Sequence, residues 1–285
     1  MNDFIVTCPS DFNSKIHKNN TLSHFKIDYD IPFNLSKDYE VGIVEIIYPT
    51  NIKNVPNDVH FYLKLEQKPL LVEYKNNYLY EYKVQSGNYS NVNNLYTEIT
   101  NQFNNLTLKS IENDLKKIYS NYEITVTILP TIKLDKKRIQ LIEGDVIFKS
   151  HAHSFTAHIY FCFDNYLHFM LGFSLSDRLH PKDIAKYNID LFGNNHCLFI
   201  YTNIIQPSFV GNEKAQLLRI IPNQKPTNDS QQMKVINFNP IIFHPVQSQI
   251  FDLIEIQIRD STGHFVIFES GKTIVTLMFR EKQQI

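Results

Sequence analysis

The last third of the chain alternates apolar and polar residues in short runs that turn residues interrupt. Three isoleucines within residues 254–258 alternate with Glu255, Gln257 and Arg259, and the sequence Asp-Ser-Thr-Gly follows at residues 260–263. A period of two predicts a β-strand with one buried face and one solvated face. Asp and Gly in a short polar run predict a hairpin turn. We therefore expect the end of the chain to form antiparallel sheet.

Strands of this kind are predicted in two groups that lie far apart in the sequence. The first group covers residues 3–8, 22–28, 39–48, 59–66 and 71–84, with a hairpin turn at residues 76–77. The second group covers residues 197–205, 216–221, 233–243, 252–259, 264–268 and 273–280. Strict alternation in residues 39–48 places Val41 and Ile43 on one face, with Glu45 following them, and Val44, Ile46 and Tyr48 on the other. A strand that is apolar on both faces is expected at the centre of a sheet.

The sequence between these two groups has a mixed character. Apolar residues recur at helical spacing over residues 92–103, directly after Ser90 and Asn91, either of which can cap a helix. A second helix is predicted at residues 108–119, and a short one after Asp164 that ends at Gly172. Strands are predicted at residues 122–129, 138–142, 145–149 and 157–163, and residues 174–195 have the composition of a loop.

These elements predict a mainly β fold in two parts. Residues 1–86 and 196–285 supply enough strands for two antiparallel sheets of four strands, which form a single jelly-roll sandwich. Residues 87–195 form a mixed α/β insertion domain. An immunoglobulin-like sandwich is the competing architecture, but it predicts a central Trp, and the chain has no Trp.

Composition argues against several classes of protein. Hydrophobic residues make up 43% of the 285 residues, which is enough for a sizeable core. The formal net charge of -1 gives the chain no overall excess of positive charge, so we expect no direct binding of nucleic acid. Cys8, Cys162 and Cys197 share no metal-ligand spacing and predict buried thiols in a reducing compartment. The first residues do not resemble a signal peptide, and no run approaches the ~18–20 apolar residues of a membrane span.

A cluster of histidines is the first candidate for chemistry. His151 and His153 would project from one face of a strand and could chelate a metal ion, but His158 has the opposite parity. A zinc site needs three or four ligands, and no Cys or acidic residue completes this set. We therefore expect an exposed polar segment before a strand, and neither a metal nor another cofactor.

Nucleophilic catalysis is the second candidate. Cys162 could act with His168 or His196, and Cys197 lies directly beside His196. The residues that flank both cysteines are apolar, which is typical of buried thiols that behave as small hydrophobic groups. Residues 260–263 only partly match an aspartic-protease motif, and a hairpin turn explains them fully. We therefore expect no catalytic residues and a protein that is not an enzyme.

Tyrosines at every second position are the remaining signal. Tyr74, Tyr78, Tyr80 and Tyr82 share one parity on the predicted strand pair. Such a row can form a subunit contact or a platform for a sugar ring, because tyrosine buries its ring and keeps its hydroxyl solvated. Packing between strands is the simpler interpretation.

Four blocks in order resemble the minor capsid (penton) proteins of Polinton/Maverick elements and adintoviruses. They are residues 34–49, residues 87–103 with their Gly-x-Tyr turn and helix, residues 164–173 ending in Leu-Gly-Phe, and residues 200–222 together with the hairpin at 256–263. The chain departs from the family pattern at Tyr39, where the family often has Trp, and at Cys8, where its Leu-Pro-Ser-Asn is Cys-Pro-Ser-Asp.

This resemblance implies a structural virion protein rather than a catalyst. It implies a single jelly roll that forms homopentamers at the five-fold vertices of an icosahedral capsid and contacts a double-jelly-roll major capsid protein. A host receptor is a further partner that such a vertex can have. The expected location is the capsid vertex, after synthesis in the host cytoplasm or nucleus. We expect the insertion at one end of the sandwich, facing outward.

Two other functions fit a jelly roll. A carbohydrate- or receptor-binding module would use aromatic and Asn side chains on a concave face. A cupin-type enzyme would hold a cluster of His and Glu inside the barrel, but the C-terminal strands have no inward His, and His60 alone is not sufficient.

Overall fold

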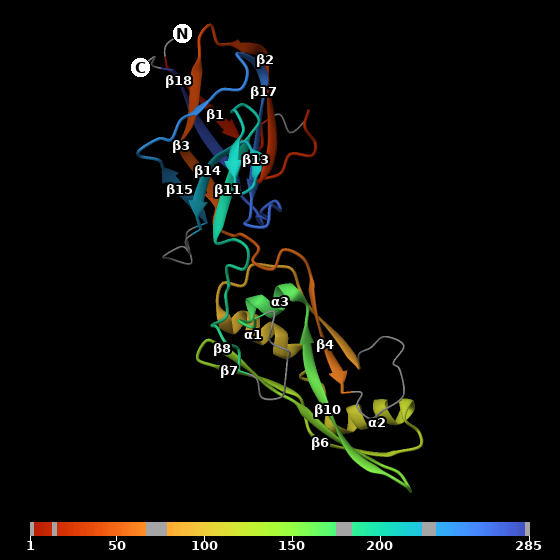
Figure 1. Cartoon of the computed structure of the whole chain (residues 1–285). Helices are drawn as coiled ribbons and strands as arrows, with labels where there is room; N and C mark the ends of the chain where they lie inside the picture. The colour runs from red at the N-terminus through yellow and green to blue at the C-terminus, as the bar shows by residue number, and fades with distance from the viewer. Residues whose placement is uncertain (1–2, 13–15, 67–78, 175–183, 224–231, 283–285) are drawn as a thin grey trace. The chain divides into compact units, whose positions relative to one another are not determined.

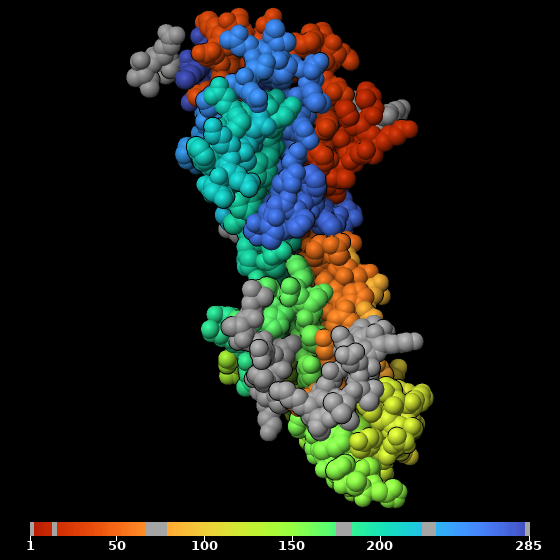
Figure 2. All heavy atoms as spheres, turned by 45° about the vertical axis from the view of Figure 1, so that its right-hand side comes forward, coloured from red at the N-terminus to blue at the C-terminus, as the bar shows by residue number. Residues whose placement is uncertain are grey.

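The computed structural model describes residues 3–12, 16–66, 79–174, 184–223 and 232–282. The chain divides into two compact units, and the first is discontinuous in sequence. The sandwich unit comprises Met1–Asn54 and Asn194–Ile285, and the insertion unit comprises Val55–Gly193. In Figure 2 the red atoms of the first strands and the blue atoms of the last strands belong to the same unit.

The sandwich unit contains two antiparallel sheets that pack face to face (Figure 1). Its eight main strands are β1 (Phe4–Pro9), β2 (His24–Asn34), β3 (Tyr39–Pro49), β11 (Cys197–Thr202), β14 (Leu217–Pro222), β15 (Met233–Asn237), β17 (Ile250–Arg259) and β18 (Ile274–Glu281). Sheet I has the order β1-β18-β3-β15, and sheet II has the order β14-β11-β17-β2. The short strand β16 (His244–Pro245) also pairs with β3, and β12 (Ser208–Val210) forms a hairpin with β13 (Glu213–Ala215).

The order of pairing defines a jelly roll. Counted along the chain, the first strand pairs with the eighth and the second with the seventh. The third pairs with the sixth and the fourth with the fifth, and all four pairs are antiparallel. The pairs β18–β3 and β11–β17 then join these four ribbons into two sheets. This is the wrapped arrangement of a double-sheet jelly roll, so the predicted fold class is confirmed.

Alternating side chains of both sheets fill the space between them. On β17 the inward isoleucines at 254, 256 and 258 are fully buried, as their period of two predicts. On β3 the inward set is Val41, Ile43, Ile46 and Tyr48. A bulge produces this pattern, because Glu45 pairs with Thr276 whereas Ile43 pairs with Leu277, and Val44 is left as an extra residue. The expectation that alternation continues through β3 is therefore wrong, whereas its central position is confirmed.

The insertion unit has one five-stranded antiparallel sheet, the insertion sheet, in the order β5-β4-β10-β9-β6. Its strands are β4 (Val59–Leu65), β5 (Tyr80–Val84), β6 (Glu123–Ile128), β9 (Gly144–Lys149) and β10 (Ser154–Phe163), and β7 (Thr131–Asp135) forms a separate hairpin with β8 (Arg138–Ile142). Helices α1 (Val92–Asn101), α2 (Leu108–Ile118) and α3 (Asn165–Met170) share one hydrophobic core with the sheet. The helices therefore cover one of its faces.

Each helix begins at the polar residue that its sequence favours. Asn91 accepts a hydrogen bond from the Asn94 amide at the start of α1. Thr107 forms a capping box with Ser110 at the start of α2. Asp164 accepts from the Leu167 amide at 2.8 Å and from the His60 amide at 3.0 Å, so it caps α3 and ties this helix to β4. The caps predicted at Asn91 and Asp164 are confirmed.

Two sequence-based boundaries differ from the structure. The sequence pattern places residues 59–84 in the sandwich, but β4 pairs with β10 and with β5, so these strands lie in the insertion unit. Alternation alone cannot identify a pairing partner about a hundred residues away. Residues 264–268 do not form a strand, because they make only isolated bridges at Phe265 and Phe268. Part of the hairpin expected within residues 71–84 lies outside the described residues.

Candidate functional site

The outward face of sheet I is rich in apolar residues. Val235, Ile47 and Ile274 form one row across β15, β3 and β18. Ile5 and Met278 form another row, and Ile5 is 61% exposed. Glu45 lies between the two rows, with Asn237 and Thr276 beside it. We define the Glu45 face as Ile5, Thr7, Glu45, Ile47, Val235, Asn237, Ile274, Thr276 and Met278.

Gly42 allows a further apolar segment to lie on this side of the sheet. A side chain at this position would place its Cβ 2.5 Å from Ile241 Cγ2 and 2.5 Å from the Ile242 carbonyl oxygen. Only glycine therefore permits residues 241–242 to approach β3 so closely. Ile242 is 51% exposed and extends the apolar surface beyond the two rows.

The outward face of sheet II has an apolar half and a polar half. Ile220, Phe199 and Arg259 form one row, and Leu217, Tyr201, Gln257 and His24 form the next. Residues on β14 and β11 thus supply apolar and aromatic groups, whereas β17 and β2 supply polar groups. We define the Arg259 face as His24, Lys26, Phe199, Tyr201, Leu217, Ile220, Glu255, Gln257, Arg259 and Phe265.

Hydrogen bonds hold the Arg259 side chain in place. Its Nε and Nη2 atoms donate to Gln257 Oε1 at 3.0 and 2.8 Å, and its Nη1 atom donates to the Gly263 carbonyl at 2.6 Å. The guanidinium also lies over the Phe265 ring, 4.3 Å from its centroid. A cation–π contact of this kind fixes a charge beside an apolar surface.

Glu255 is the acidic member of this face. Burial raises the pKa of its carboxyl, but hydrogen bonds from Gln257 and His24 and the nearby Lys26 charge outweigh burial and lower it overall. His24 Nε2 donates to Glu255 Oε1 at 2.6 Å. Among the residues that define the face, Lys26 and Arg259 are positively charged and Glu255 is negatively charged. Asp28, which lies beyond Lys26 on the same side of β2, adds a second carboxylate, and His17 pairs with it. The Glu45 face carries one formal negative charge.

The insertion sheet also has a face without helices, and this face is polar. His60 Nδ1 lies 2.9 Å from Glu81 Oε1, and His158 Nδ1 lies 2.8 Å from Asp145 Oδ1. We define the insertion-sheet face as His60, Tyr62, Lys64, Glu81, Lys83, Asp145, Ile147, His158, Tyr160 and Cys162. Paired charges and half-buried tyrosines make a surface that water can solvate.

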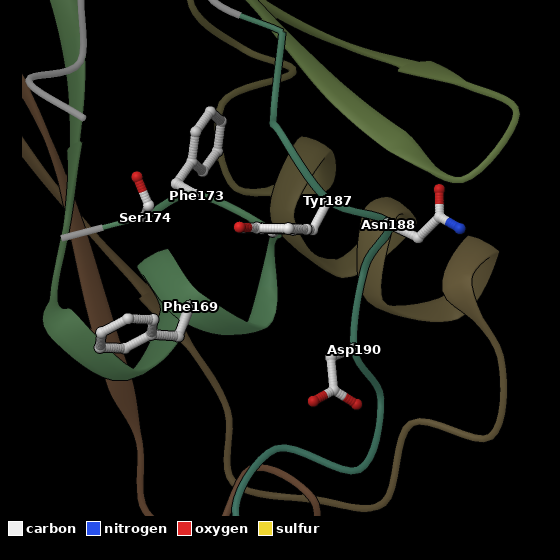
Figure 3. A pocket seen from close by; sticks show the side chains of 7 residues that line it. Phe169, Phe173, Ser174, Tyr187, Asn188 and Asp190 are labelled. Carbon is white, nitrogen blue, oxygen red and sulfur yellow. The ribbon is translucent and has the colours of Figure 1, made fainter. Parts of the chain in front are cut away.

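A cavity of about 360 Å³ lies beside α3 in the insertion unit. The rings of Phe169, Phe173 and Tyr187 border it, and Asp190 lies farther along the segment that carries Tyr187 (Figure 3). Phe169 and Tyr187 are 48% and 55% exposed. Gly172 has a φ of +89°, and a Cβ there would lie 2.3 Å from the Tyr187 carbonyl oxygen. Exposed rings beside amide and carboxylate groups can stack on a sugar ring and bind its hydroxyls.

A smaller cavity of about 260 Å³ lies in the sandwich unit and has a polar lining. Lys37 is already paired with Glu281 at 2.6 Å. The Gln247 side chain accepts a hydrogen bond from Gln216 at 2.5 Å. Two of the polar side chains that line this cavity are thus paired with residues outside its lining.

The histidines proposed as ligands do not converge. His151 and His153 are exposed in the turn between β9 and β10, where the Ser150 amide donates to the His153 carbonyl. His158 lies on β10 and pairs with Asp145. Within the described ranges, no group of three His, Cys, Asp or Glu side chains could hold a metal ion.

The three thiols have different environments. Cys8 is fully buried in the sandwich core, and burial raises the pKa of its thiol to about 12. Cys162 and Cys197 are only partly buried, so the expectation of buried thiols is wrong for these two. His168 is buried, and its Nε2 donates to the Ser174 carbonyl at 2.8 Å.

The remaining patterns have structural roles. Asp260 Oδ1 accepts from the amides of Thr262 and His264, and Gly263 has a φ of +85°, which confirms a turn. Tyr80 and Tyr82 pack against the insertion core, and Tyr80 donates to Asp114 at 2.7 Å. Tyr74 and Tyr78 lie outside the described residues.

Comparisons with known proteins identify no family. No family model matches the chain, and no curated protein does. Among solved structures, the crystal structure of the mavirus penton protein aligns over 97% of this chain and 99% of that chain, with 10% identity and a TM-score of 0.41. A similarity of this size carries no conclusion about this chain. None of the helices within the described residues is long and apolar enough to cross a membrane.

Proposed function

We propose that the chain is a structural capsid protein, a penton subunit that forms pentamers at the five-fold vertices of an icosahedral virion. The observation that carries this proposal is the complete eight-strand jelly roll of the sandwich unit. Viral capsid proteins, lectins and cupins are the main users of this architecture. The residues that resemble Polinton/Maverick and adintovirus pentons support the first of these classes.

The interior of the sandwich supports a structural role over a cupin-type one. Its buried polar residues among those described are Ser10, Ser23, Asn54, Asn195, Thr202 and Thr273. A cupin would instead place His and Glu side chains inside the barrel. Apart from the Cys8 thiol, the described core of this unit is otherwise aliphatic and aromatic.

A penton subunit has defined partners and a defined position in the virion. The chain would contact further copies of itself and a double-jelly-roll major capsid protein, with a host receptor as a further partner at the vertex. The insertion unit, which leaves the sandwich after the third jelly-roll strand and returns before the fourth, would face outward. A capsid reconstruction with this unit on the inner surface would contradict that orientation.

Native mass spectrometry and negative-stain images of the purified full chain test the proposal. We expect closed rings of five copies that become more abundant as concentration rises. A chain that stays monomeric at every concentration, both alone and with a double-jelly-roll major capsid protein, would contradict a penton role.

The cavity beside α3 favours a second function, binding of a carbohydrate or of a glycosylated receptor. Phe169 and Tyr187 supply exposed rings there, and Asp190 supplies a carboxylate. Glycan-array binding by the full chain that is lost in Tyr187→Ala and kept in Tyr160→Ala would support this function. Absence of saturable binding to any glycan would reject it.

A further inference from the structure

We propose that the Glu45 face of one copy docks on the Arg259 face of the next copy, with the Glu45 carboxylate paired to the Arg259 guanidinium. This inference rests on the proposed penton function and adds to it the two surfaces and the ion pair that join neighbouring subunits. It commits to a second copy of this chain as the occupant of both faces.

Both faces have the composition of subunit interfaces. The Glu45 face presents aliphatic side chains and a methionine in two rows, with Val235 at 53% and Ile5 at 61% exposure. The Arg259 face presents Phe199, Tyr201 and Ile220 beside a fixed arginine. Aromatic residues, Met and Arg are the residue types that interfaces favour. Apolar rows of this kind are stabilised when another surface covers them.

The side chains of Glu45 and Arg259 carry opposite charges. Glu45 is the one charged residue among those that define its face, and no described residue forms an ion pair with it. Glu40 and Arg280, in the row beyond Met278 on the same side of sheet I, pair with each other. Arg259 uses three of its five N–H groups within the described part of the chain, which leaves two for a carboxylate. Each of these two charged groups also lies beside apolar residues. Ile47 and Ile274 lie beside Glu45. Phe199 and Ile220 lie in the same row as Arg259. Exclusion of water by these rows strengthens a charge-assisted hydrogen bond.

The position of the two faces determines the kind of assembly. They are the outer surfaces of the two sheets that pack against each other, so they lie on opposite sides of the sandwich. Contact between two different patches is heterologous, and repeated heterologous contacts produce closed rings when the rotation closes. A pentamer is a ring of this kind.

The insertion-sheet face provides the internal control for this argument. It is also a sheet face without helices, yet its histidines and carboxylates are paired within the face. A face adapted to solvent in this chain therefore has internal ion pairs and few aliphatic side chains. The residues that define the Glu45 face have no such pairs, whereas the polar half of the Arg259 face has them between Glu255 and both His24 and Lys26.

Charge reversal tests the pairing. We expect Glu45→Lys and Arg259→Glu each to weaken self-association by about tenfold or more, because each places like charges opposite one another. The double variant should recover most of the loss. Sedimentation velocity over a concentration range measures the effect for the full chain.

Matched variants separate this effect from a general change in charge. Glu123→Lys and Lys64→Glu make the same charge changes on the insertion sheet and should leave association unchanged. If Glu45→Lys unfolds, Glu45→Gln takes its place, and if Arg259→Glu unfolds, Arg259→Gln takes its place. We expect these variants to lose less of the self-association. Circular dichroism verifies the fold of every variant.

The outcomes distinguish the inference from the proposed function. Rings that form in the wild type and persist in both charge-reversal variants would overturn the assigned faces and leave the penton role intact. If both single variants lose self-association and the double variant does not recover it, the direct Glu45–Arg259 pair would be overturned. A wild type that stays monomeric both alone and with a double-jelly-roll major capsid protein would overturn the penton role together with the interface.

Discussion

The sandwich unit and the insertion unit each expose sheet faces that no helix covers, and these faces differ in kind. On sheet I two apolar rows flank Glu45, and Glu40 pairs with Arg280 beyond them. On the insertion sheet the corresponding residues are histidines, tyrosines and charged groups that pair with one another. The sheets share the same antiparallel architecture, so the difference reflects what each face meets. We infer that the insertion sheet meets water and that the sandwich meets another subunit.

Truncating one core aromatic residue in each unit should produce the largest effects. Phe279 is fully buried and stacks on Phe4, and Phe61 is fully buried and stacks on Tyr82. We expect Phe279→Ala and Phe61→Ala each to cost about 3–5 kcal/mol. Hydrogen exchange should show lost protection in β1, β3 and β18 for the first variant and in β4, β5 and β10 for the second. Equal loss in both units from either variant would mean that the units do not have separate cores.

A methyl group at Gly42 should displace residues 241–242, which lie next to the Glu45 face on the outward side of sheet I. Gly42→Ala brings Cβ within 2.5 Å of the Ile242 carbonyl, so residues 241–242 must move away from β3. Overpacking of this kind costs about 1–3 kcal/mol, which urea denaturation measures. Gly87→Ala is the control, because its Cβ meets only a Tyr89 ring carbon at 3.9 Å. A Gly42→Ala variant as stable as the control would show that this segment is not held against the sheet.

Loss of the α3 cap should have a smaller effect that is confined to the insertion unit. Asp164 accepts hydrogen bonds from two backbone amides, those of Leu167 and His60. Asp164→Ala should destabilise the insertion unit by about 1–2 kcal/mol, as thermal unfolding can measure. Asp164→Asn keeps one acceptor oxygen and should recover part of the loss. An unchanged melting temperature in the Ala variant would contradict the double role of this carboxylate.

Acidification should have the smallest effect and should act on the sandwich. Burial raises the pKa of Glu255, but hydrogen bonds from Gln257 and His24 lower it below its usual value overall. A folded-state pKa below the unfolded value contributes stability above the unfolded pKa of about 4.3, and this stability is lost as pH falls through the folded pKa. Wild-type stability should therefore fall more steeply below about pH 4 than that of Glu255→Gln. If the free energy of unfolding depends on pH in the same way for the wild type and for Glu255→Gln, this account would be contradicted.

Local sequence patterns predicted the helices and strands better than they predicted which strands pair with each other. The isoleucines of β17, the helices that begin after Asn91 and Asp164, and the turn at Asp260 all follow from side-chain period and cap chemistry. The membership of β4 in the insertion unit does not, because it depends on pairing with β10, about a hundred residues away. The jelly roll could still be predicted, because the two groups of strands supply enough strands for two sheets of four even after β4 and β5 are assigned to the insertion unit.

The residues of the candidate interface could also be predicted only in part, because some of them depend on strand pairing. Alternation on β17 correctly assigned Glu255, Gln257 and Arg259 to the solvated face. The outward position of Glu45 depends on the bulge at Val44, which is set by the pairing of β3 with β18. Strict alternation therefore grouped Glu45 with the buried Val41 and Ile43, and the apolar rows beside it could not be recognised as one surface. The signal that could have found it is the polar residue within an otherwise apolar strand.

Hydroxyl-radical footprinting at low and high protein concentration tests the central comparison most directly. Oxidation reports side-chain exposure, and both kinds of face contain reactive residues. We predict that Met278 on the Glu45 face and Phe199 and Tyr201 on the Arg259 face become protected as concentration rises. Tyr62 and Tyr160 on the insertion-sheet face should keep their reactivity. Protection of these two tyrosines, with Met278 and Phe199 unchanged, would contradict the assignment of the sandwich as the unit that joins copies of the chain.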